Sequence, residues 1–162
     1  DDQTKNAWCM PGGKIAFYSG ILPIAKNEDG IASIMGHEIA HAVARHSAER
    51  ASTAMLTDFG IMAVEKFVLG QRLPQASGYV RQFGLDLPFN RKQETEADYL
   101  GIIFSSLAGY NIEESYKVWE RMKEEGGSGP AEFWSTHPSP DNRIKKLKEW
   151  IPIVSRQYPA IG

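Results

Sequence analysis

Two histidines and a glutamate lie within one short segment, His37-Glu38-Ile39-Ala40-His41. Residues four apart share one face of a helix, so the two imidazoles can bind a single cation at about 2.0–2.1 Å. Glu38 follows the first histidine and would lie near the open side of that cation, where it accepts a proton from water instead of binding the metal. The spacing therefore predicts a hydrolytic zinc site with one Zn2+ ion per chain.

The alternative for this pentapeptide is a surface helix with two ordinary histidines. The flanking residues Ile34, Ala42 and Val43 are small or apolar, which favours a helix that faces the core. Burying two histidines and a carboxylate costs free energy unless their polar atoms are satisfied. A bound metal ion would satisfy them together.

A catalytic zinc site needs a third protein ligand. The extended motif that adds a glycine and a third histidine is not present, because Ala44 and Ser47 occupy those two positions. His46 comes five residues after His41, about 140° further round a continuous helix. We therefore expect His46 to be a surface histidine that points away from the metal.

An acidic segment, Glu94-Thr95-Glu96-Ala97-Asp98, is the richest source of a third ligand. Glu94 and Asp98 share a helix face, whereas Glu96 points about 160° away from Glu94. Glu94 could then bind the metal while Asp98, one turn further on, hydrogen bonds to a ligand histidine and orients it. Periodicity leaves the choice open, because Glu96 adjoins an apolar stripe and the whole segment also fits a solvated helix start.

The elements that must position these residues are mainly helical. Residues 27 to about 50 have helical periodicity behind Asn27, a good N-cap, and the metal motif lies in their middle. The helices expected after this one span residues 53–69, 92–108, 111–123 and 141–150, with Asp141 as the cap of the last.

The rest of the chain predicts a hairpin and one long connection. Short β-prone runs at residues 6–10 and 14–19 flank a Pro-Gly-Gly turn and predict the hairpin. Residues 70–84 contain four glycine or proline breaks, so we expect residues 70–90 to form an irregular connection that acts as a lid or partner surface. The expected fold class is α+β, mainly α, with a single domain over residues 1–162.

The bulk composition excludes several functions. The formal charge of −2 comes from 18 basic and 20 acidic residues without a basic stripe, so no nucleic-acid partner is expected. The longest apolar stretch, at about residues 59–69, is far shorter than the roughly 20 residues that span a bilayer. Cys9 is the single cysteine and leaves no intrachain disulfide. The start at Asp1 without Met predicts a mature or excised domain, with any membrane anchor removed or outside it.

Four motifs, in order along the chain, resemble one peptidase family. They are NAWCMPGG at 6–13, HEIAH at 37–41, ETEADY at 94–99, and STHP at 135–138 followed by RI at 143–144. From about Asn6 to Trp150 the chain resembles the gluzincin peptidase family of HtpX, BepA and the CAAX prenyl protease. It is most similar to the soluble branch, the periplasmic BepA-like proteins and the mitochondrial inner-membrane stress protease with overlapping activity to the m-AAA protease. The resemblance implies a zincin-like fold with a helical active-site core.

The resemblance also implies roles for residues that spacing leaves open. The family's E-x-x-A-D pattern implies Glu94 as the third zinc ligand and Asp98 as its helper. His137 corresponds to a histidine that stabilises the tetrahedral intermediate or closes on the metal in a self-inhibited form. Arg143 and Asn6 correspond to groups that orient the oxyanion or the substrate. From the residues alone, His137 is equally a loop histidine and Arg143 a surface cation.

Residues and resemblance together lead us to expect a zinc-dependent endopeptidase with Glu38, His137 and Arg143 as its catalytic residues. Its expected substrates are unfolded or extended polypeptides, in misfolded or membrane-associated proteins. The hairpin strand would pair with an extended substrate by strand addition. Besides Asn6, the expected substrate-binding residues are therefore Lys14, Ile15, Ala16 and Phe17.

Two other functions compete with this one. A latent metal-bound chaperone or scaffold of the same family would use His137 as a fourth ligand, although Glu38 has no use in a purely structural site. An aminopeptidase would need an acidic anchor for a free amine, and no residue suggests one. The expected location is extracytoplasmic and membrane-associated, with the bacterial periplasm first and the mitochondrial inner membrane as the alternative. A membrane or outer-membrane assembly partner would bind through regions outside this chain.

Overall fold

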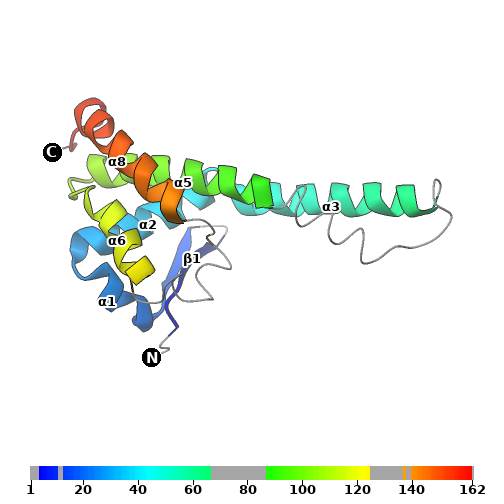
Figure 1. Ribbon diagram of the computed structural model, residues 1–162, viewed down its shortest axis with the longest axis horizontal. Coiled ribbons are helices and arrows are strands. Elements are labelled where there is room, and N and C mark those ends of the chain that lie inside the picture. Colours follow the sequence, from blue (N-terminus) through cyan, green and yellow to red (C-terminus); the bar gives the residue numbers. More distant parts are fainter. Residues whose placement is uncertain (1–3, 11–12, 67–86, 125–136, 138–139, 162) are drawn as a thin grey trace.

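The computed structural model describes residues 4–10, 13–66, 87–124, 137 and 140–161. Helices α2, α5, α6 and α8 form a helical body with a small sheet beside it, and α3 extends away from this body (Figure 1). In chain order the elements are β1 Ala7–Met10, β2 Lys14–Phe17, the 3-10 turn Ser19–Ile21, α1 Leu22–Ala25, α2 Glu28–Val43, α3 His46–Val64, α5 Leu87–Leu107, α6 Glu114–Glu124 and α8 Pro140–Gln157. The expected α+β, mainly α fold is confirmed.

The predicted hairpin is present as strands β1 and β2. The strands pair antiparallel with Ala7 opposite Phe17 and Met10 opposite Lys14. Gly13 closes the turn with φ +80 and donates its N–H to the Met10 carbonyl at 3.0 Å. A residue with positive φ favours glycine, since it carries no Cβ.

Helix α2 begins as the sequence predicts but ends earlier. The Asn27 side chain accepts a hydrogen bond from the Gly30 N–H at 2.8 Å, which satisfies one free donor of the first turn. The predicted end near residue 50 is wrong, because α2 stops at Val43 and Arg45 adopts a left-handed conformation with φ 57. Helices commonly end with such a residue, usually glycine. Here it is an arginine, so no glycine or proline marks the break in the sequence.

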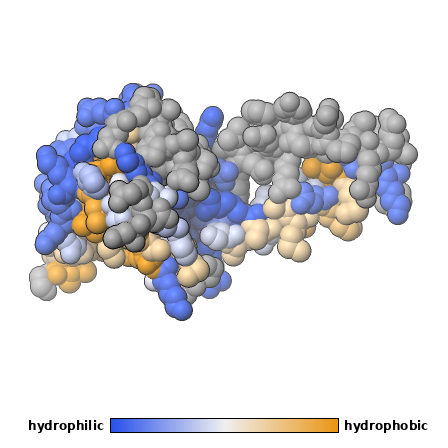
Figure 2. Space-filling view, turned by 90° about the horizontal axis from the view of Figure 1, so that it is seen from below, coloured by the Kyte–Doolittle hydropathy of each residue, from blue (hydrophilic) through white to orange (hydrophobic). Residues whose placement is uncertain are grey.

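Helix α3 begins directly after this turn, at His46 and not at residue 53 as predicted. Its predicted end at residue 69 lies outside the described residues. The apolar stripe of this helix is exposed, with Met55, Leu56 and Phe59 at 74%, 75% and 72% of their full accessibility. Apolar surface runs along the part of α3 that leaves the body (Figure 2).

Helix α5 also differs from its prediction, because it begins at Leu87 and not at residue 92. Pro88 suggests a helix break in the sequence, yet proline is tolerated in the first turn, where the backbone N–H has no intrahelical partner. Residues 87–90 of the expected irregular connection are therefore helical, and residues 70–86 lie outside the described residues.

Helices α2 and α5 pack backbone against backbone beside the metal motif. A Cβ on Gly36 would lie 2.7 Å from the Gly101 carbonyl oxygen, and a Cβ on Gly101 would lie 2.9 Å from the backbone nitrogen of His37. Only residues without a Cβ allow so close an approach. This contact brings the histidine face of α2 against the acidic face of α5.

We expect Gly101→Ala to lower both the free energy of unfolding and the affinity for zinc. The added Cβ would meet backbone atoms of α2, so the helix pair must separate, and overpacking of this kind costs about 1–3 kcal/mol. Urea unfolding and zinc titration measure the two effects. Gly60→Ala in α3 is the control, because its Cβ would meet no atom of the described residues within 4 Å. Equal behaviour of the two variants would contradict the expectation.

Helices α6 and α8 complete the body around a core that they share with α1 and α5. Its most buried side chains include Ile24, Met122, Leu147 and Val154. The Asn111 side chain accepts a hydrogen bond from the Glu113 N–H at 3.1 Å just before α6 begins. Asp141 is not the cap of the last helix, because α8 begins one residue earlier at Pro140, and Asp141 lies in the first turn. No helix in the described ranges is both long and apolar enough to cross a bilayer.

Candidate metal centre

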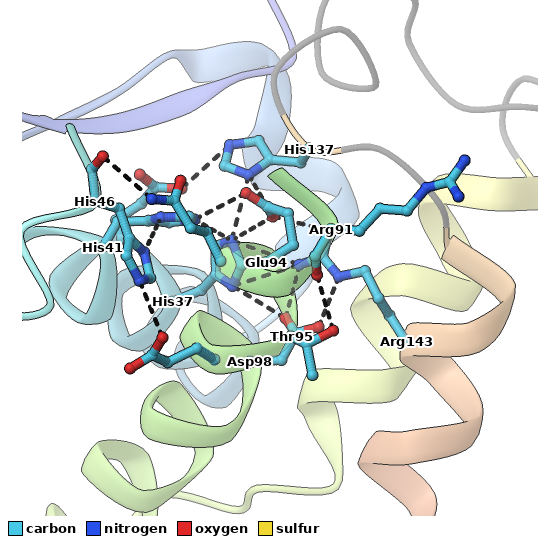
Figure 3. Close-up of polar contacts among 12 residues, drawn as sticks. His37, His41, His46, Arg91, Glu94, Thr95, Asp98, His137 and Arg143 are labelled. Carbon is cyan, nitrogen blue, oxygen red and sulfur yellow. Dashed lines mark hydrogen bonds and ion pairs between the residues drawn. The ribbon is translucent and has the colours of Figure 1, made fainter. Parts of the chain in front are cut away.

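Four buried side chains from three parts of the chain meet at one point (Figure 3). Helix α2 contributes His37 and His41, helix α5 contributes Glu94, and His137 comes from the segment before α8. One ligand atom from each lies within 4.8 Å of the other three. All four residues are among those predicted from the sequence to lie at the site.

The donor atoms are those that zinc requires. The Nε2 atoms of His37 and His41 lie 3.1 Å apart, and the two Glu94 oxygens lie 3.2 Å and 3.0 Å from them, respectively. Two imidazole nitrogens and a carboxylate oxygen are the ligands of many catalytic zinc sites. Each of these side chains is at most 7% exposed, so the ligand atoms are largely shielded from solvent. The residues present therefore fit a zinc ion.

Asp98 orients the His37 ring through the ring nitrogen that points away from the centre. Nδ1 of His37 lies 3.0 Å from the Asp98 carboxylate, while its Nε2 faces the centre. Partners of this kind fix the tautomer and the ring plane of a metal-binding histidine. Of the two carboxylates that the sequence left open as ligands, Glu94 lies in the centre, and Glu96 is 53% exposed on the other side of the helix.

Arg143 lies behind the ligands, on α8. Its guanidinium makes two bonds of 2.6 Å to the Asp98 carboxylate and approaches Glu94 at 3.1 Å. It also stacks 3.9 Å above the Trp119 ring. Although burial opposes ionisation of Asp98, the Arg143 charge holds the pKa of Asp98 below its ordinary value. Burial likewise opposes ionisation of Glu94, but His137 and Arg143 hold the pKa of Glu94 well below its ordinary value.

The expectation that His46 is a surface residue is wrong. Its side chain is 1% exposed, and its Nδ1 lies 2.8 Å from Nδ1 of His41. A continuous helix would carry His46 to another face, but the left-handed turn at Arg45 directs it back towards α2. A sequence signal for this turn is lacking, since an arginine stands where glycine is usual.

Glu38 lies beside the ligands without being one of the cluster. Burial raises the pKa of its carboxyl group, and the nearby histidines only partly oppose this. Its Oε1 lies 3.5 Å from Nε2 of His137 and has no hydrogen-bond partner within the part of the chain that the structure describes. A carboxyl group with a raised pKa and an unused oxygen is suited to general acid–base work.

The residues expected to bind substrate are on the hairpin. The Asn6 side chain accepts a hydrogen bond from the Ala7 N–H at 2.9 Å, at the start of β1. Lys14, Ile15, Ala16 and Phe17 form β2. The strand next to the centre is β1, because it packs against α2, and the Cys9 backbone acts to lower the pKa of the Glu38 carboxyl group. That the hairpin binds substrate stays a prediction.

We expect the metal-free protein to lose stability between about pH 6.5 and 9. Burial alone would lower the pKa of His37, but its contacts with Asp98 and Glu94 prevail and raise the pKa to about 9. The folded state then holds the proton more tightly than the unfolded chain. This stabilisation is complete below pH 6.5 and is lost as the pH rises through 9, at up to about 1.4 kcal/mol per pH unit.

Urea unfolding of the metal-free protein across this range measures the loss, with His37→Gln as the control that lacks the titrating group. The same slope in both proteins would contradict the assignment. Burial lowers the pKa of His41 to about 3, so His41 is already neutral and adds no slope here. Zinc requires neutral imidazoles, so zinc affinity should increase over the same interval.

A buried cluster of histidines and a carboxylate, with a second carboxyl group poised beside it, is the arrangement of a metal-dependent hydrolase. Residues 1–151 match peptidase family M48, and the chain belongs to this family. The resemblance found in the sequence is thereby confirmed.

Curated relatives support the same family. The chain is 46% identical over 154 residues to the mitochondrial metalloendopeptidase OMA1 of Schizosaccharomyces pombe, covering 93% of this chain and 45% of the relative. It is 39% identical over 168 residues to the protein of the same name from Saccharomyces cerevisiae, with 94% and 45% covered. It is 30% identical over 156 residues to the beta-barrel assembly-enhancing protease of Yersinia pestis, with 88% and 32% covered. The chain thus spans less than half the length of these relatives. No solved structure matches the chain.

Proposed function

We propose that this chain is the catalytic domain of a zinc-dependent endopeptidase. The observation that carries the proposal is the position of Glu38, a buried carboxyl group whose Oε1 has no hydrogen-bond partner among the described residues, beside two imidazoles and a second carboxylate. A purely structural metal site has no use for such a base. Zinc held by His37, His41 and Glu94 would polarise the scissile carbonyl and acidify water.

The chain's own residues would handle the proton and the developing charge. Glu38 accepts a proton from the attacking water and later passes it to the leaving amine. His137 lies between Glu38 and Glu94, at 3.5 Å and 2.9 Å, and would donate a hydrogen bond to the oxyanion. One such donor typically contributes a few kcal/mol. Arg143 is engaged with Asp98 and Glu94, so we assign it to positioning these carboxylates.

For the substrate we propose an extended polypeptide that adds to the hairpin as a further strand. Strand addition recognises the backbone more than the side chains, which suits unfolded proteins. Contact between the Cys9 backbone and Glu38 favours the edge of β1, beside the base, over β2 as the strand that receives it. A proline next to the scissile bond of a cleaved peptide removes a backbone donor and should abolish cleavage. Unchanged cleavage would rule this mode out.

The second candidate is a latent state or a metal-bound scaffold, favoured by the position of His137. Its Nδ1 lies 2.9 Å from Glu94 and 3.3 Å from Nε2 of His37, within the ligand cluster. If His137 occupies the fourth position, His137→Ala should cleave faster than the natural protein. If His137 instead serves the oxyanion, the same variant should cleave more slowly while zinc affinity is retained.

The experiment that tests the proposal is cleavage of unfolded casein by the zinc-loaded chain. We expect internal cuts that stop when a chelator removes the metal and resume when zinc is restored. Stoichiometric zinc binding with no cleavage by the natural protein or by His137→Ala would overturn the endopeptidase and favour the scaffold.

The names of the relatives suggest where the protein acts. They place the proteins that the chain resembles in mitochondria or associate them with β-barrel assembly. We propose an organelle or cell-envelope setting. The higher identity to the two mitochondrial proteins favours the mitochondrion over the bacterial periplasm, the location expected first from the sequence. We further propose that partners at the membrane bind regions of the protein outside this chain.

A further inference from the structure

His41 and His46 form a buried pair whose geometry determines where their protons lie. Nε2 of His41 faces the centre, 3.0 Å from Glu94, so its other ring nitrogen faces outward. That nitrogen, Nδ1, lies 2.8 Å from Nδ1 of His46. Two imidazole nitrogens at this distance share a single proton, donated by one ring and accepted by the other.

Metal binding assigns the donor. A neutral imidazole that gives its Nε2 lone pair to a cation carries its proton on Nδ1. His41 must then donate, and Nδ1 of His46 must accept. His46 therefore carries its own proton on Nε2, which is buried and has no hydrogen-bond partner among the described residues. The Glu96 carboxylate lies 3.5 Å from this Nε2 and is half exposed to solvent.

The surroundings hold His46 at this position. It is the first residue of α3, next to the left-handed turn at Arg45, and its side chain is 1% exposed. The buried Gln93 of α5 donates to the His46 carbonyl at 3.4 Å and to Glu49 at 2.9 Å, which ties the start of α3 to α5. The ring is thus constrained by both helices, next to the ligand that it contacts (Figure 3).

We propose that His46 is a positioning residue for the metal ligand His41, with the Glu96 carboxylate 3.5 Å from its other ring nitrogen. The inference rests on the proposed function, because it assumes that His41 binds a metal. The two ligand histidines then differ. Asp98 supports His37 with a charged carboxylate, whereas an uncharged imidazole supports His41. His46 fixes the tautomer and the ring plane of His41 without adding a further negative charge to the centre.

The test compares His46→Asn with His46→Gln. The Asn side-chain oxygen lies near the position of Nδ1 and retains the acceptor for His41, whereas the Gln amide reaches the position of Nε2 and leaves His41 without one. Both changes are polar and uncharged. We expect zinc affinity, measured by chelator competition, to stay within about threefold for His46→Asn. We expect it to fall about 10–100-fold for His46→Gln, the usual loss for an outer partner of a ligand.

A second readout is the visible spectrum of the cobalt-substituted protein, which reports ligand geometry and is independent of activity. We expect His46→Asn to retain the natural spectrum and His46→Gln to change it. Glu96→Gln, an exposed change, should weaken zinc binding by no more than severalfold. Equal zinc affinities and equal spectra for His46→Asn and His46→Gln would overturn the proposal. Failure of the natural protein to bind zinc would instead refute the proposed function itself.

Discussion

Replacing Glu38 with glutamine should reduce casein cleavage by about 10²–10⁴-fold while zinc still binds. The amide has nearly the shape of the carboxylate but does not accept a proton from water. Burial raises the pKa of Glu38, so its affinity for a proton is higher than that of an exposed glutamate. The ligands His37, His41 and Glu94 are unchanged, so the zinc affinity should be close to that of the natural protein.

Initial rates of casein cleavage and zinc competition, measured on the same preparations, separate the two effects. Glu124→Gln is the matched control, since it makes the same chemical change at an exposed position at the end of α6. It should leave both quantities unchanged. A Glu38→Gln protein that cleaves at the natural rate would remove the general base from the mechanism, and one that loses zinc would make Glu38 part of the metal site.

Replacing Arg143 with leucine should destabilise the metal-free protein by about 3–5 kcal/mol. Arg143 is 4% exposed and binds Asp98 through two hydrogen bonds while approaching Glu94. Leucine would leave the two buried carboxylates without the guanidinium that they share. Breaking a buried pair costs more than the pair contributes, because the remaining charge is left unsolvated.

Urea unfolding at pH 7 measures this loss, and Lys148→Leu provides the control. Lys148 pairs with Glu120 at 2.6 Å on the surface, where such a pair contributes about 0–1 kcal/mol. Arg143→Lys should be intermediate, since an ammonium group does not reproduce the two parallel bonds of the guanidinium. Similar losses for Arg143→Leu and Lys148→Leu would contradict the role of a buried counterion.

The Arg143 effect should also depend on pH. Arg143 holds the pKa of Asp98 below its ordinary value, so their interaction stabilises the fold above the ordinary carboxyl range. It is lost as the pH falls through the lowered pKa and Asp98 gains a proton. The stability difference between the natural protein and Arg143→Leu should therefore shrink in acid. A difference that stayed constant into strong acid would point to lost packing on Trp119 instead of lost charge.

What the sequence determined by itself is local. The i, i+4 spacing of His37 and His41 places both rings on one helix face in any helix that contains them. The same geometry separates the faces of Glu94 and Glu96, and Asn27 caps α2 through a bond to a residue three positions on. These patterns need only the helical repeat, so they could be predicted without knowledge of the fold.

Tertiary structure decided how these local pieces meet. Gly36 and Gly101 let α2 and α5 approach closely enough for Glu94 to reach the histidines, and no periodic pattern encodes a contact between helices so far apart in sequence. The turn at Arg45 directs His46 towards His41, against the prediction from a continuous helix. Arg143 hydrogen bonds to Asp98 only because α8 packs on α5. Such contacts depend on the packing of whole elements, whereas helical periodicity describes only neighbours along one element.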